Sequence, residues 1–486
     1  MAHLLVATVP LTGHVHPMLL LVRSLVARGH HVQWYAAKKF AGSIQATGAT
    51  FAPMRAAHDW DDADVEAALP ALHGKRGLAR VKVQLQSMFI DPAPEQLRDL
   101  EALVDKARPD AVIADQAHLG AALLAEKHGL PWVGLGISAL MAPSIDTAPF
   151  GSARRPAREG EPRWIYRFLN WLIFRVLFRG VNRAYQRARA AAGLPSTERT
   201  YFDVMSPQLY LQPTVPAFEY PRSDLPPQVQ FIGPLVPASS LSATLPPWWS
   251  DLEAARVRGT PIVLVTQGTL ATDPQELIAP ALRALADEPV LVVATTSASP
   301  DALASPTAGP PAGTIAGPPA GASPAALASP AVNPLAGASA GLPANARIAS
   351  FIPYQSLMPL LSAMVTNGGY GGVQMALAAG VPLVVAGGSE EKPEIAARVQ
   401  WSGVGLDLRT GRPKPEQLRA AVRRVLDEPR FRDRARAIAA DMADYDAPVR
   451  GAALIEQLVG ATAAAAATAT TVAQSGNSSR SVTAAL

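Results

Sequence analysis

Two side chains that could exchange a proton with a substrate follow apolar, strand-like runs in the first quarter of the chain. His14 stands in the segment LTGHVHP just after the run at 4–10, and Asp115 ends the run DAVIAD at 110–115. Because the carboxyl ends of parallel strands lie at one edge of a sheet, both residues are expected at that edge. A carboxylate beside an imidazole fixes its tautomer and stabilises its charged form, so His14 could accept a proton from a hydroxyl near neutral pH.

Each of these residues also has a structural interpretation. His14 could be a loop histidine that caps the following helix, and Asp115 could be the N-cap of a helix that begins near His118. A metal site that starts with His14 and His16 is a further alternative, but Pro17 follows directly and no nearby cysteine or carboxylate completes a ligand set. We therefore expect no metal, and the shared sheet edge favours the catalytic interpretation.

A glycine cluster marks a second candidate site, in the second half of the chain. The segment VTNGGYGGVQMALAAGVP at 365–382 has Gly368, Gly369, Gly371 and Gly372 between an apolar run and a helix-like stretch. Glycines gather where the backbone turns sharply or comes close to a partner. The unpaired N–H groups of a helix N-terminus suit a phosphate or diphosphate. A tight strand-to-helix turn without a ligand would explain the same glycines.

Other candidates stand at further strand ends of the second half. The segment TQGT ends a strand and supplies Gly268 and Thr269, whose backbone N–H and hydroxyl could bind a phosphate. The segment SFIPYQSL supplies Phe351 and Tyr354, and either ring could stack on a base. Core packing would explain either ring equally well.

Alternating strands and helices are needed to position these residues. A strand at 4–10, a helix at 16–30 with Pro17 in its first turn, and a strand at 31–37 form a β-α-β unit, which predicts a parallel sheet. Further strands are expected at 110–115, 131–136, 261–269, 289–296, 346–353, 362–366 and 381–388. The sequence therefore predicts an α/β protein with two doubly wound, Rossmann-like domains that face each other across a cleft.

Breaks in the periodic pattern give the expected boundaries. We expect an N-terminal domain at 1–235, a linker rich in proline and serine at 236–250, a second domain at 251–442, a helix at 443–460 and a flexible tail at 461–486. Residues 297–343 are almost wholly Ala, Pro, Gly and Ser, and they are expected to be a disordered surface insertion. The alanine run after 460 could instead extend the preceding helix.

The composition narrows the class of protein. A chain of 486 residues exceeds what one hydrophobic core organises, and 49% hydrophobic with 17% charged residues is typical of a soluble globular protein. It has no cysteine, which excludes disulfides and fits a reducing cytoplasm. The N-terminus has no pattern of a secretory leader. The net charge is +4 and no basic tract carries interleaved aromatics, so no nucleic-acid partner is expected.

Two long motifs resemble those of a known family. The segment TGHVHPMLLLVRSLVARGHHV at 12–32 is similar to the N-terminal signature of the macrolide and UDP-sugar glycosyltransferases of GT-B fold. The segment that runs from FIPYQSL at 351 to SGVG at 405 resembles their donor-binding signature in order and spacing. The resemblance covers nearly the whole chain apart from the insertion and the tail.

The resemblance implies a mechanism and a division of labour. The first domain would bind the acceptor and the second the donor, with His14 as general base and Asp115 as its orienting carboxylate. The acceptor hydroxyl would attack the anomeric carbon while the nucleoside diphosphate leaves from the opposite face, which inverts the configuration. The glycine turn and the helix after it would stabilise the departing diphosphate without a metal. No cofactor is implied beyond the nucleoside-diphosphate sugar as co-substrate.

The same resemblance assigns the donor contacts. They are Gly13, Gly268, Thr269, Phe351, Ile352, Tyr354, Asn367, Gly368, Gly369, Gly371, Gly372, Val373, Gln374, Glu391 and Lys392. Phe351 falls where the family has a base-stacking tryptophan, the backbone of Ile352 where the base edge is bonded, and Tyr354 where glutamine is common.

This sequence departs from the family pattern at several of these positions. Asn367 replaces a phosphate-binding histidine, and Met375 replaces a glutamate that bonds the ribose hydroxyls. A deoxyribose donor would tolerate the second change, which leaves a dTDP-sugar open beside a UDP-sugar, for which Gln374 could serve the ribose. Glu391 and Lys392 replace the Asp-Gln pair that contacts the sugar. The alternative function is therefore a nucleotide-sugar binding protein with impaired catalysis.

One basic, apolar stretch lies outside both motifs. Residues 163–187 place arginine at 163, 167, 175, 179, 183 and 187, beside many apolar residues. The arginines interrupt it too often for it to span a bilayer, but it could lie on an anionic membrane surface and suit a lipid acceptor. We favour a domain helix whose apolar face lines the acceptor pocket or packs on the first sheet. Either alternative predicts an apolar acceptor and a cytoplasmic protein, peripheral at most to the inner face of the membrane.

Overall fold

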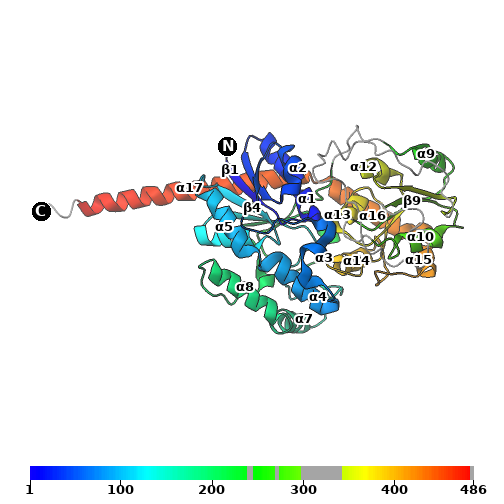
Figure 1. Ribbon diagram of the computed structural model, residues 1–486, viewed down its shortest axis with the longest axis horizontal. Helices are drawn as coiled ribbons and strands as arrows, with labels where there is room; N and C mark the ends of the chain where they lie inside the picture. The colour runs from blue at the N-terminus through cyan, green and yellow to red at the C-terminus, as the bar shows by residue number, and fades with distance from the viewer. Residues whose placement is uncertain (238–244, 269–272, 297–341, 482–486) are drawn as a thin grey trace.

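Two parallel sheets, one in each half of the chain, organise the molecule (Figure 1). The computed structural model describes residues 1–237, 245–268, 273–296 and 342–481. The seven-stranded first sheet has the order β3-β2-β1-β4-β5-β6-β7, and the six-stranded second sheet has the order β10-β9-β8-β11-β12-β13. Helices cover both sheets, so the predicted pair of Rossmann-like α/β domains is confirmed.

The strands are short and mostly buried. In the first sheet they are β1 (His3–Ala7), β2 (His31–Ala36), β3 (Thr50–Pro53), β4 (Ala111–Asp115), β5 (Trp132–Leu135), β6 (Leu209–Gln212) and β7 (Val229–Phe231). In the second they are β8 (Ile262–Thr266), β9 (Leu291–Thr295), β10 (Ala346–Ala349), β11 (Ala363–Thr366), β12 (Leu383–Val385) and β13 (Gly405–Asp407). The central strands are buried on both faces, which explains their nearly continuous apolar runs.

The helices of the first half are α1 (Thr12–Ala27), α2 (Ala41–Gln45), α3 (Val65–Ala68), α4 (Gly77–Gln84), α5 (Ala93–Val104), α6 (Leu119–His128), α7 (Arg163–Asn170) and α8 (Arg179–Ala191). Two π-helical segments, η4 (Leu85–Ile90) and η5 (Trp171–Leu177), continue α4 and α7. The later helices are α9 (Trp249–Val257), α10 (Ile278–Leu285), α12 (Tyr354–Leu357), α13 (Tyr370–Ala378), α14 (Lys392–Trp401), α15 (Pro415–Asp427), α16 (Pro429–Ala443) and α17 (Ala447–Ser481). Single 3-10 turns are η1 (Lys38–Phe40), η2 (Asp62–Asp64), η3 (Pro70–Leu72), η6 (Tyr201–Asp203), η7 (Pro216–Phe218) and η8 (Met358–Leu360).

Helix α1 begins earlier than the sequence pattern predicts. Its first residue is Thr12, whose N–H and hydroxyl both bind the buried carboxylate of Asp62, at 2.6 and 3.0 Å. Pro17 therefore lies inside the helix and not in its first turn. Proline has no N–H to donate, so the carbonyl of Gly13 receives no helical hydrogen bond from it. His14 consequently stands on a helix, and the interpretation as a loop histidine is wrong.

The expected domain boundaries fall partly outside the described residues. Strand β7 ends at Phe231 and helix α9 begins at Trp249, but residues 238–244 of the expected linker are not described. The same is true of the expected insertion, apart from residues 342 and 343. The limits 1–235, 236–250 and 251–442 stay predictions.

The C-terminal helix returns to the first half of the molecule. Its residues Ala447, Ala452 and Ile455 are buried in the core formed around the first sheet. Glu456 accepts a hydrogen bond from Nε of Arg28 at 2.9 Å. The helix expected at 443–460 begins at Ala447 and continues to Ser481, so the backbone of 461–481 is helical and extends away from the body (Figure 1). Alanine has the highest helix propensity, which explains the extension of the helix into the expected tail.

Candidate active site

The first sheet brings His14 and Asp115 into contact. Strand β1 pairs in parallel with β4, with Ala7 opposite Ala114, so the segments after the two strands are neighbours. His14 is the third residue of α1 and Asp115 is the last residue of β4. The Nδ1 atom of His14 lies 3.0 Å from Oδ1 of Asp115. The pairing that the strand ends predict is thus present, and both side chains are buried.

Backbone groups fix the carboxylate of Asp115 in place. Its Oδ2 accepts the N–H of Val9 at 2.9 Å, and its Oδ1 accepts the N–H of Ala117 at 2.8 Å. Burial alone would raise the pKa of Asp115, but its interaction with His14 and the hydrogen bond from the N–H of Val9 outweigh burial and lower the pKa. An ionised carboxylate only accepts, so Nδ1 is the nitrogen that carries the proton in a neutral His14 ring, and Nε2 is then the nitrogen that can accept one.

The cap of helix α6 is His118 and not Asp115. The helix begins at Leu119, and Nδ1 of His118 accepts the N–H of Ala121 at 3.1 Å. Asp115 is therefore not the N-cap that its position before the helix allowed. Burial lowers the pKa of His118 to about 4, so this second histidine is neutral and held beside the His14–Asp115 pair without taking part in it.

Apolar side chains form the wall beside His14. The ring of Phe89, in the π-helical segment η4, lies stacked at 6.2 Å from the imidazole. Phe89 also packs on a small cluster formed by Val9, Leu11, Trp60, Leu69, Leu72 and Met88. An acceptor hydroxyl that reaches Nε2 of His14 would therefore lie on a largely apolar surface.

The glycine turn forms the start of helix α13. Gly368 has φ of +91°, and a Cβ there would lie 2.9 Å from Cγ1 of Val385, so this position requires glycine. Gly369 is the N-cap, and as a glycine it has no side chain that could bond the free N–H groups of the first turn. A Cβ at Gly371 would meet no atom within 4 Å, and Gly371 is exposed. The N-terminus of α13 could therefore bind an anion, because the space around Gly371 is not needed for packing of the fold.

Polar side chains with unused hydrogen-bonding atoms surround this turn. The amide of Asn367 donates to the carbonyl of Gln267, while its Oδ1 is buried without a partner among the described residues. Gln374 is buried with both amide atoms unpartnered within the described chain. Val373 is a core residue and can offer only its backbone. Gly268 lies next to Asn367, whereas Thr269 lies outside the described residues.

The aromatic candidates of the second half differ in exposure and bonding. Phe351 follows β10 and its side chain is 63% exposed, whereas Ile352 beside it is buried. The hydroxyl of Tyr354 lies 2.7 Å from Oγ1 of Thr295 and 2.9 Å from Oγ1 of Thr266. Phe351 is therefore available for stacking on a base. Tyr354 instead ties the ends of β8 and β9 to helix α12, a role that the sequence did not suggest.

Glu391 and Lys392 stand at the start of helix α14, opposite the first half. Lys392 pairs with Glu390, a non-glycine residue with φ of +58°. Burial and then the Glu390 carboxylate raise the pKa of Glu391, while Lys392 and His14 act in the opposite direction. Gly13 precedes His14 on α1 and is also exposed.

Buried contacts that sequence reasoning missed join the two halves. Arg398 of α14 binds Glu219 of the first half and Glu394 of its own helix, at 2.7 and 3.0 Å. Glu394 in turn accepts the N–H groups of Gly151 and Ala153, at 2.8 and 2.7 Å. No local motif marks these residues, since their partners lie up to 243 positions away.

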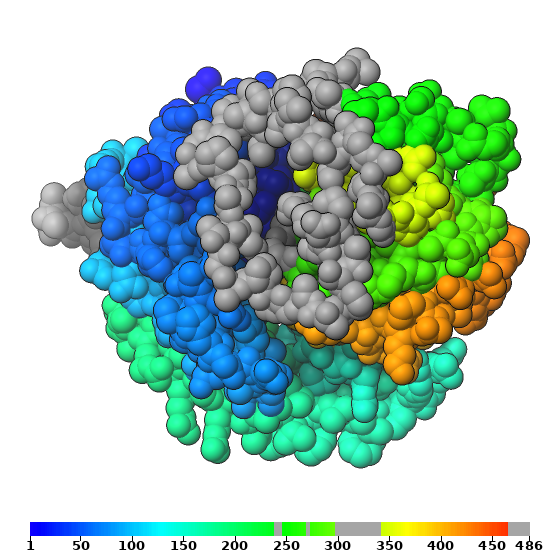
Figure 2. Space-filling view, turned by 45° about the vertical axis from the view of Figure 1, so that its right-hand side comes forward, coloured from blue at the N-terminus to red at the C-terminus, as the bar shows by residue number. Residues whose placement is uncertain are grey.

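Figure 2 shows a hollow between the N-terminal half in blue and the C-terminal half in green and yellow. Dark blue residues from the start of the chain lie deep within it. A hydrogen bond from Nε2 of Gln212 to the hydroxyl of Tyr370, at 3.1 Å, also links the halves, because Tyr370 is the first residue of α13. This bond places the first residue of α13 at the boundary between the two halves.

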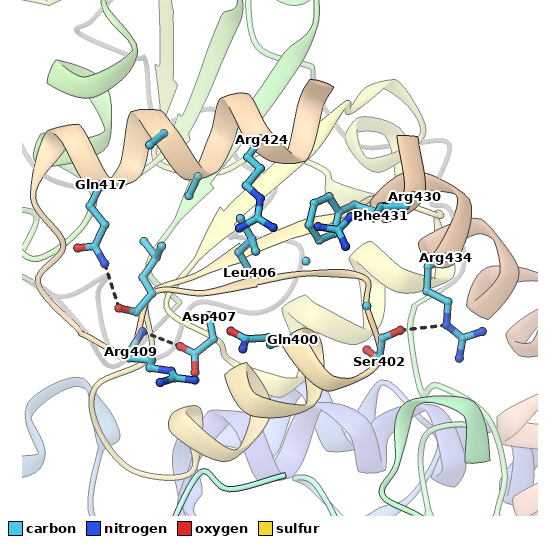
Figure 3. A pocket seen from close by; sticks show the side chains of 15 residues that line it. Gln400, Ser402, Leu406, Asp407, Arg409, Gln417, Arg424, Arg430, Phe431 and Arg434 are labelled. Atoms are coloured by element: carbon cyan, nitrogen blue, oxygen red, sulfur yellow. Dashed lines mark hydrogen bonds between the residues drawn. The ribbon is translucent and has the colours of Figure 1, made fainter. Parts of the chain in front are cut away.

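A separate cavity of about 750 Å³ lies in the second half (Figure 3). Strand β13 and helices α14, α15 and α16 line it, with Arg424, Arg430, Arg434 and Phe431 among the side chains. None of the predicted site residues lines this cavity. Among the residues that the structure describes, no group of three or more His, Asp or Glu side chains is arranged to hold a metal ion.

The two facing Rossmann-like domains, with a histidine–carboxylate pair on one side and an open glycine-rich helix end on the other, define a glycosyltransferase of GT-B fold. The structure of the calicheamicin glycosyltransferase CalG4 is similar, with a TM-score of 0.65 and 22% identity over 95% of this chain and 98% of that one. The glycosyltransferase VinC, solved in complex with dTDP, gives a TM-score of 0.59 and 20% identity over 94% and 99%. These likenesses show the fold.

Sequence relatives give the family. The C-terminal domain described as erythromycin biosynthesis protein CIII-like matches residues 334–458. The 4'-demethylrebeccamycin synthase of Lentzea aerocolonigenes is 41% identical over 94% of this chain and 100% of its own length. The UDP-glucosyltransferase A1 of Starmerella bombicola is 28% identical over 91% and 89%. The chain belongs to the natural-product glycosyltransferases that use nucleoside-diphosphate sugars.

Proposed function

We propose that this enzyme transfers a sugar, with inversion and without a metal ion, from a UDP- or dTDP-sugar to a hydroxyl of an apolar small molecule or lipid. The observation that carries the proposal is the 3.0 Å contact between Nδ1 of His14 and Oδ1 of Asp115, at the carboxyl edge of the first sheet. This contact leaves Nε2 of His14 as a base directed away from the carboxylate.

The proposed reaction is a single displacement. Nε2 of His14 takes the proton of the acceptor hydroxyl while the acceptor oxygen forms its bond to the anomeric carbon. The bond from that carbon to the diphosphate oxygen breaks on the opposite face, and its electron pair leaves with the nucleoside diphosphate. Asp115 stabilises the imidazolium that results and does not itself take up the proton.

The N-terminus of helix α13 is the proposed anion site for the leaving group. The N–H groups at Gly371 and Gly372 lie in the first turn of α13, whose N-cap Gly369 has no side chain to bond them. Their partial positive charge is fixed before the reaction, so it stabilises the developing diphosphate charge without reorganisation. In this proposed role the glycines replace the metal ion that other phosphate-transfer sites use.

The nucleotide of the donor stays open between UDP and dTDP. One relative bears the name UDP-glucosyltransferase, and a structural neighbour was solved with dTDP. The exposed ring of Phe351 is the proposed stacking surface for either base. The orphaned amide of Gln374 lies one position before Met375 and is the proposed partner of a ribose hydroxyl.

An apolar acceptor is proposed because of the wall beside His14. The residues of this wall, Phe89 together with Val9, Leu11 and Trp60, have uncharged and mainly apolar side chains. The 41% identical relative is named as the synthase of 4'-demethylrebeccamycin, so a secondary metabolite is the acceptor class that we propose first. We also propose a cytoplasmic location, which suits a chain without cysteine.

The substitution His14→Ala tests the proposal, with His16→Ala as the matched control on the same helix. His14→Ala should abolish transfer of sugar to a panel of apolar acceptors while calorimetry finds the affinity for UDP or dTDP within about twofold of wild type. His16→Ala should retain transfer, and the product of the wild type should have the inverted anomeric configuration by NMR. Unchanged turnover in His14→Ala would remove His14 from the reaction. A wild-type protein that binds nucleotide and transfers to no acceptor would instead favour the binding protein with impaired catalysis.

A further inference from the structure

A row of aromatic side chains on the first half faces solvent. Trp164, Phe168 and Trp171 are 65%, 50% and 51% exposed and stand four and three residues apart, on one face of α7 and the start of η5. The rings of Phe168 and Trp171 stack at 5.9 Å. Ile165, Val176 and Leu177 are also exposed. Large apolar side chains that cluster in this way on a surface indicate a contact with something outside the chain.

The inner side of the same segment is hydrogen-bonded and packed against other parts of the first half. Asn170 is buried and donates to the carbonyls of Ser144 and Thr147, both at 3.0 Å. Phe174 is buried and stacks on Phe202 at 4.4 Å. One side of this segment therefore packs against the first half, while its expected place beside the acceptor pocket or on the first sheet stays a prediction. The exposed aromatic row belongs to the other side and has no partner among the described residues.

Helix α4 extends this surface. Its residues Leu78 and Val81 are exposed, and Nζ of Lys82 lies 5.7 Å from the ring centroid of Phe178, at the end of η5. Figure 1 shows α4 and α7 at the same end of the first half, and Figure 2 shows their residues together at its lower rim. We call the exposed residues of α7, η5 and α4 together the α7 face.

The charged side chains that the segment 163–187 itself supplies to the α7 face are of one sign. Residues 163–187 contain six arginines at the positions given above and no aspartate or glutamate. Arg163 pairs with Asp146 at 2.7 Å. Arg167, Arg175 and Arg179 are exposed, and none of them forms an ion pair with a described residue. Basic side chains without acidic partners next to exposed tryptophans are typical of helices that lie in the plane of an anionic membrane.

We propose that the α7 face rests on an anionic lipid surface. Its tryptophan and phenylalanine rings enter the interface between headgroups and acyl chains, while Arg167, Arg175 and Arg179 bind the lipid phosphates. The chain lies on the membrane and does not cross it, because no described helix is long and apolar enough to span a bilayer. Lipid fits better than a second copy of the chain, because two such faces would bring like charges together. With the function proposed above, this position would bring the cleft close to acceptors dissolved in the membrane.

Sedimentation of the full chain with vesicles tests the proposal. The protein should sediment with phosphatidylcholine vesicles that contain phosphatidylglycerol, less with phosphatidylcholine alone, and less when salt rises from about 0.1 M to about 0.5 M. The pair Arg167→Glu/Arg175→Glu should weaken binding at least about tenfold. The pair Trp164→Ser/Phe168→Ser should weaken it to a similar extent without loss of fold, since both side chains are half exposed or more.

The matched control is the pair Arg256→Glu/Arg258→Glu at the C-terminal end of helix α9, which reverses two exposed arginines of the second half. This pair should leave vesicle binding within about twofold of wild type. Equal loss in the control would reduce the effect to net charge and overturn the proposal, as would a wild type that does not sediment. Light scattering that finds a dimer which Trp164→Ser/Phe168→Ser dissolves would assign the α7 face to a second copy instead. Unaltered nucleotide affinity in all variants would separate this result from the proposed reaction.

Discussion

Arg398 of helix α14 holds the carboxylate of Glu219 across the boundary between the two halves at 2.7 Å, and both side chains are almost completely buried. The guanidinium also lies over the ring of Tyr220, at 4.1 Å from its centroid. The buried pair therefore fixes the position of helix α14 relative to the first half of the chain.

Replacing Arg398 with methionine should lower the free energy of unfolding by about 3–5 kcal/mol, because two carboxylates, of Glu219 and Glu394, would stay buried without a cation. Urea unfolding followed by tryptophan fluorescence measures the loss. Arg283→Met, at an exposed arginine of α10, is the control and should change stability by less than about 0.5 kcal/mol. If Arg398→Met were as mild as the control, the pair would not contribute to the junction of the halves.

The substitution Asp115→Asn should reduce the turnover rate by at least about a hundredfold and leave the affinity for nucleotide unchanged. An amide can donate to Nδ1 of His14, which would place the imidazole proton on Nε2, where the base must be free. Stopped assays for kcat and calorimetry for the dissociation constant separate the two effects. A parallel loss of both would mean that Asp115 supports the fold and not the base.

Alanine at Gly371 should weaken binding of UDP or dTDP at least about tenfold without loss of stability, because its methyl group would occupy only the space that we assign to the diphosphate. Alanine at Gly368 should destabilise the fold by about 1–3 kcal/mol, because of its positive φ and the contact with Val385. Gly460→Ala, on α17 and equally free of neighbours, is the control that should change only helix stability. Full nucleotide affinity in Gly371→Ala would contradict the anion site.

Substitutions should distinguish the roles of the two aromatic candidates, Phe351 and Tyr354. Phe351→Ala should weaken nucleotide binding at least about fivefold with no change in melting temperature, since its ring is largely exposed. Tyr354→Phe should leave nucleotide affinity unchanged and cost about 1–2 kcal/mol of stability, because the hydroxyl bonds of Thr266 and Thr295 are lost. The reverse pattern would exchange their roles.

His118 should make stability depend on pH. Burial lowers its pKa from 6.5 to about 4, so between these values the unfolded chain binds a proton that the folded chain does not. The contribution of His118 to the free energy of unfolding is fully present above about pH 6.5. It declines as the pH falls toward 4, by about 3 kcal/mol in all. The variant His118→Asn keeps an acceptor for the N–H of Ala121 but does not titrate, so its unfolding energy should fall less over this range. Parallel curves for the two proteins would contradict the buried neutral histidine.

Local patterns were sufficient to predict the sheets and the chemistry at their edges. Continuous apolar runs predicted the central strands, because strands buried on both faces have no polar side. The pairing of His14 with Asp115 followed from the rule that parallel strands end at one edge, and β1 and β4 are indeed neighbours. The glycine turn was recognisable because a positive φ and an open helix end both select glycine.

Contacts between distant residues could not be predicted in this way. The early start of α1 depends on Asp62, 50 positions from Thr12, and Pro17 gave a misleading signal for a later start. The local sequence around His118 does not tell whether this histidine caps a helix. The structure shows the cap through the hydrogen bond from the N–H of Ala121 to Nδ1 of His118. Tyr354 and Arg398 are defined by partners on other strands and in the other half, for which a single sequence has no periodic signal.

Helix α17 gives the order of synthesis a physical consequence. Ala447, Ala452 and Ile455 belong to the core of the first sheet, yet they are translated after every strand of both sheets. When the ribosome has completed residues 1–237, the first half still lacks part of its own interior, and apolar residues such as Leu21 and Ile232 next to Gly451 remain open to water. A chain that stops before Ala447 lacks these side chains and leaves this part of the core open. The first half can therefore complete its core only after helix α17 has been synthesised.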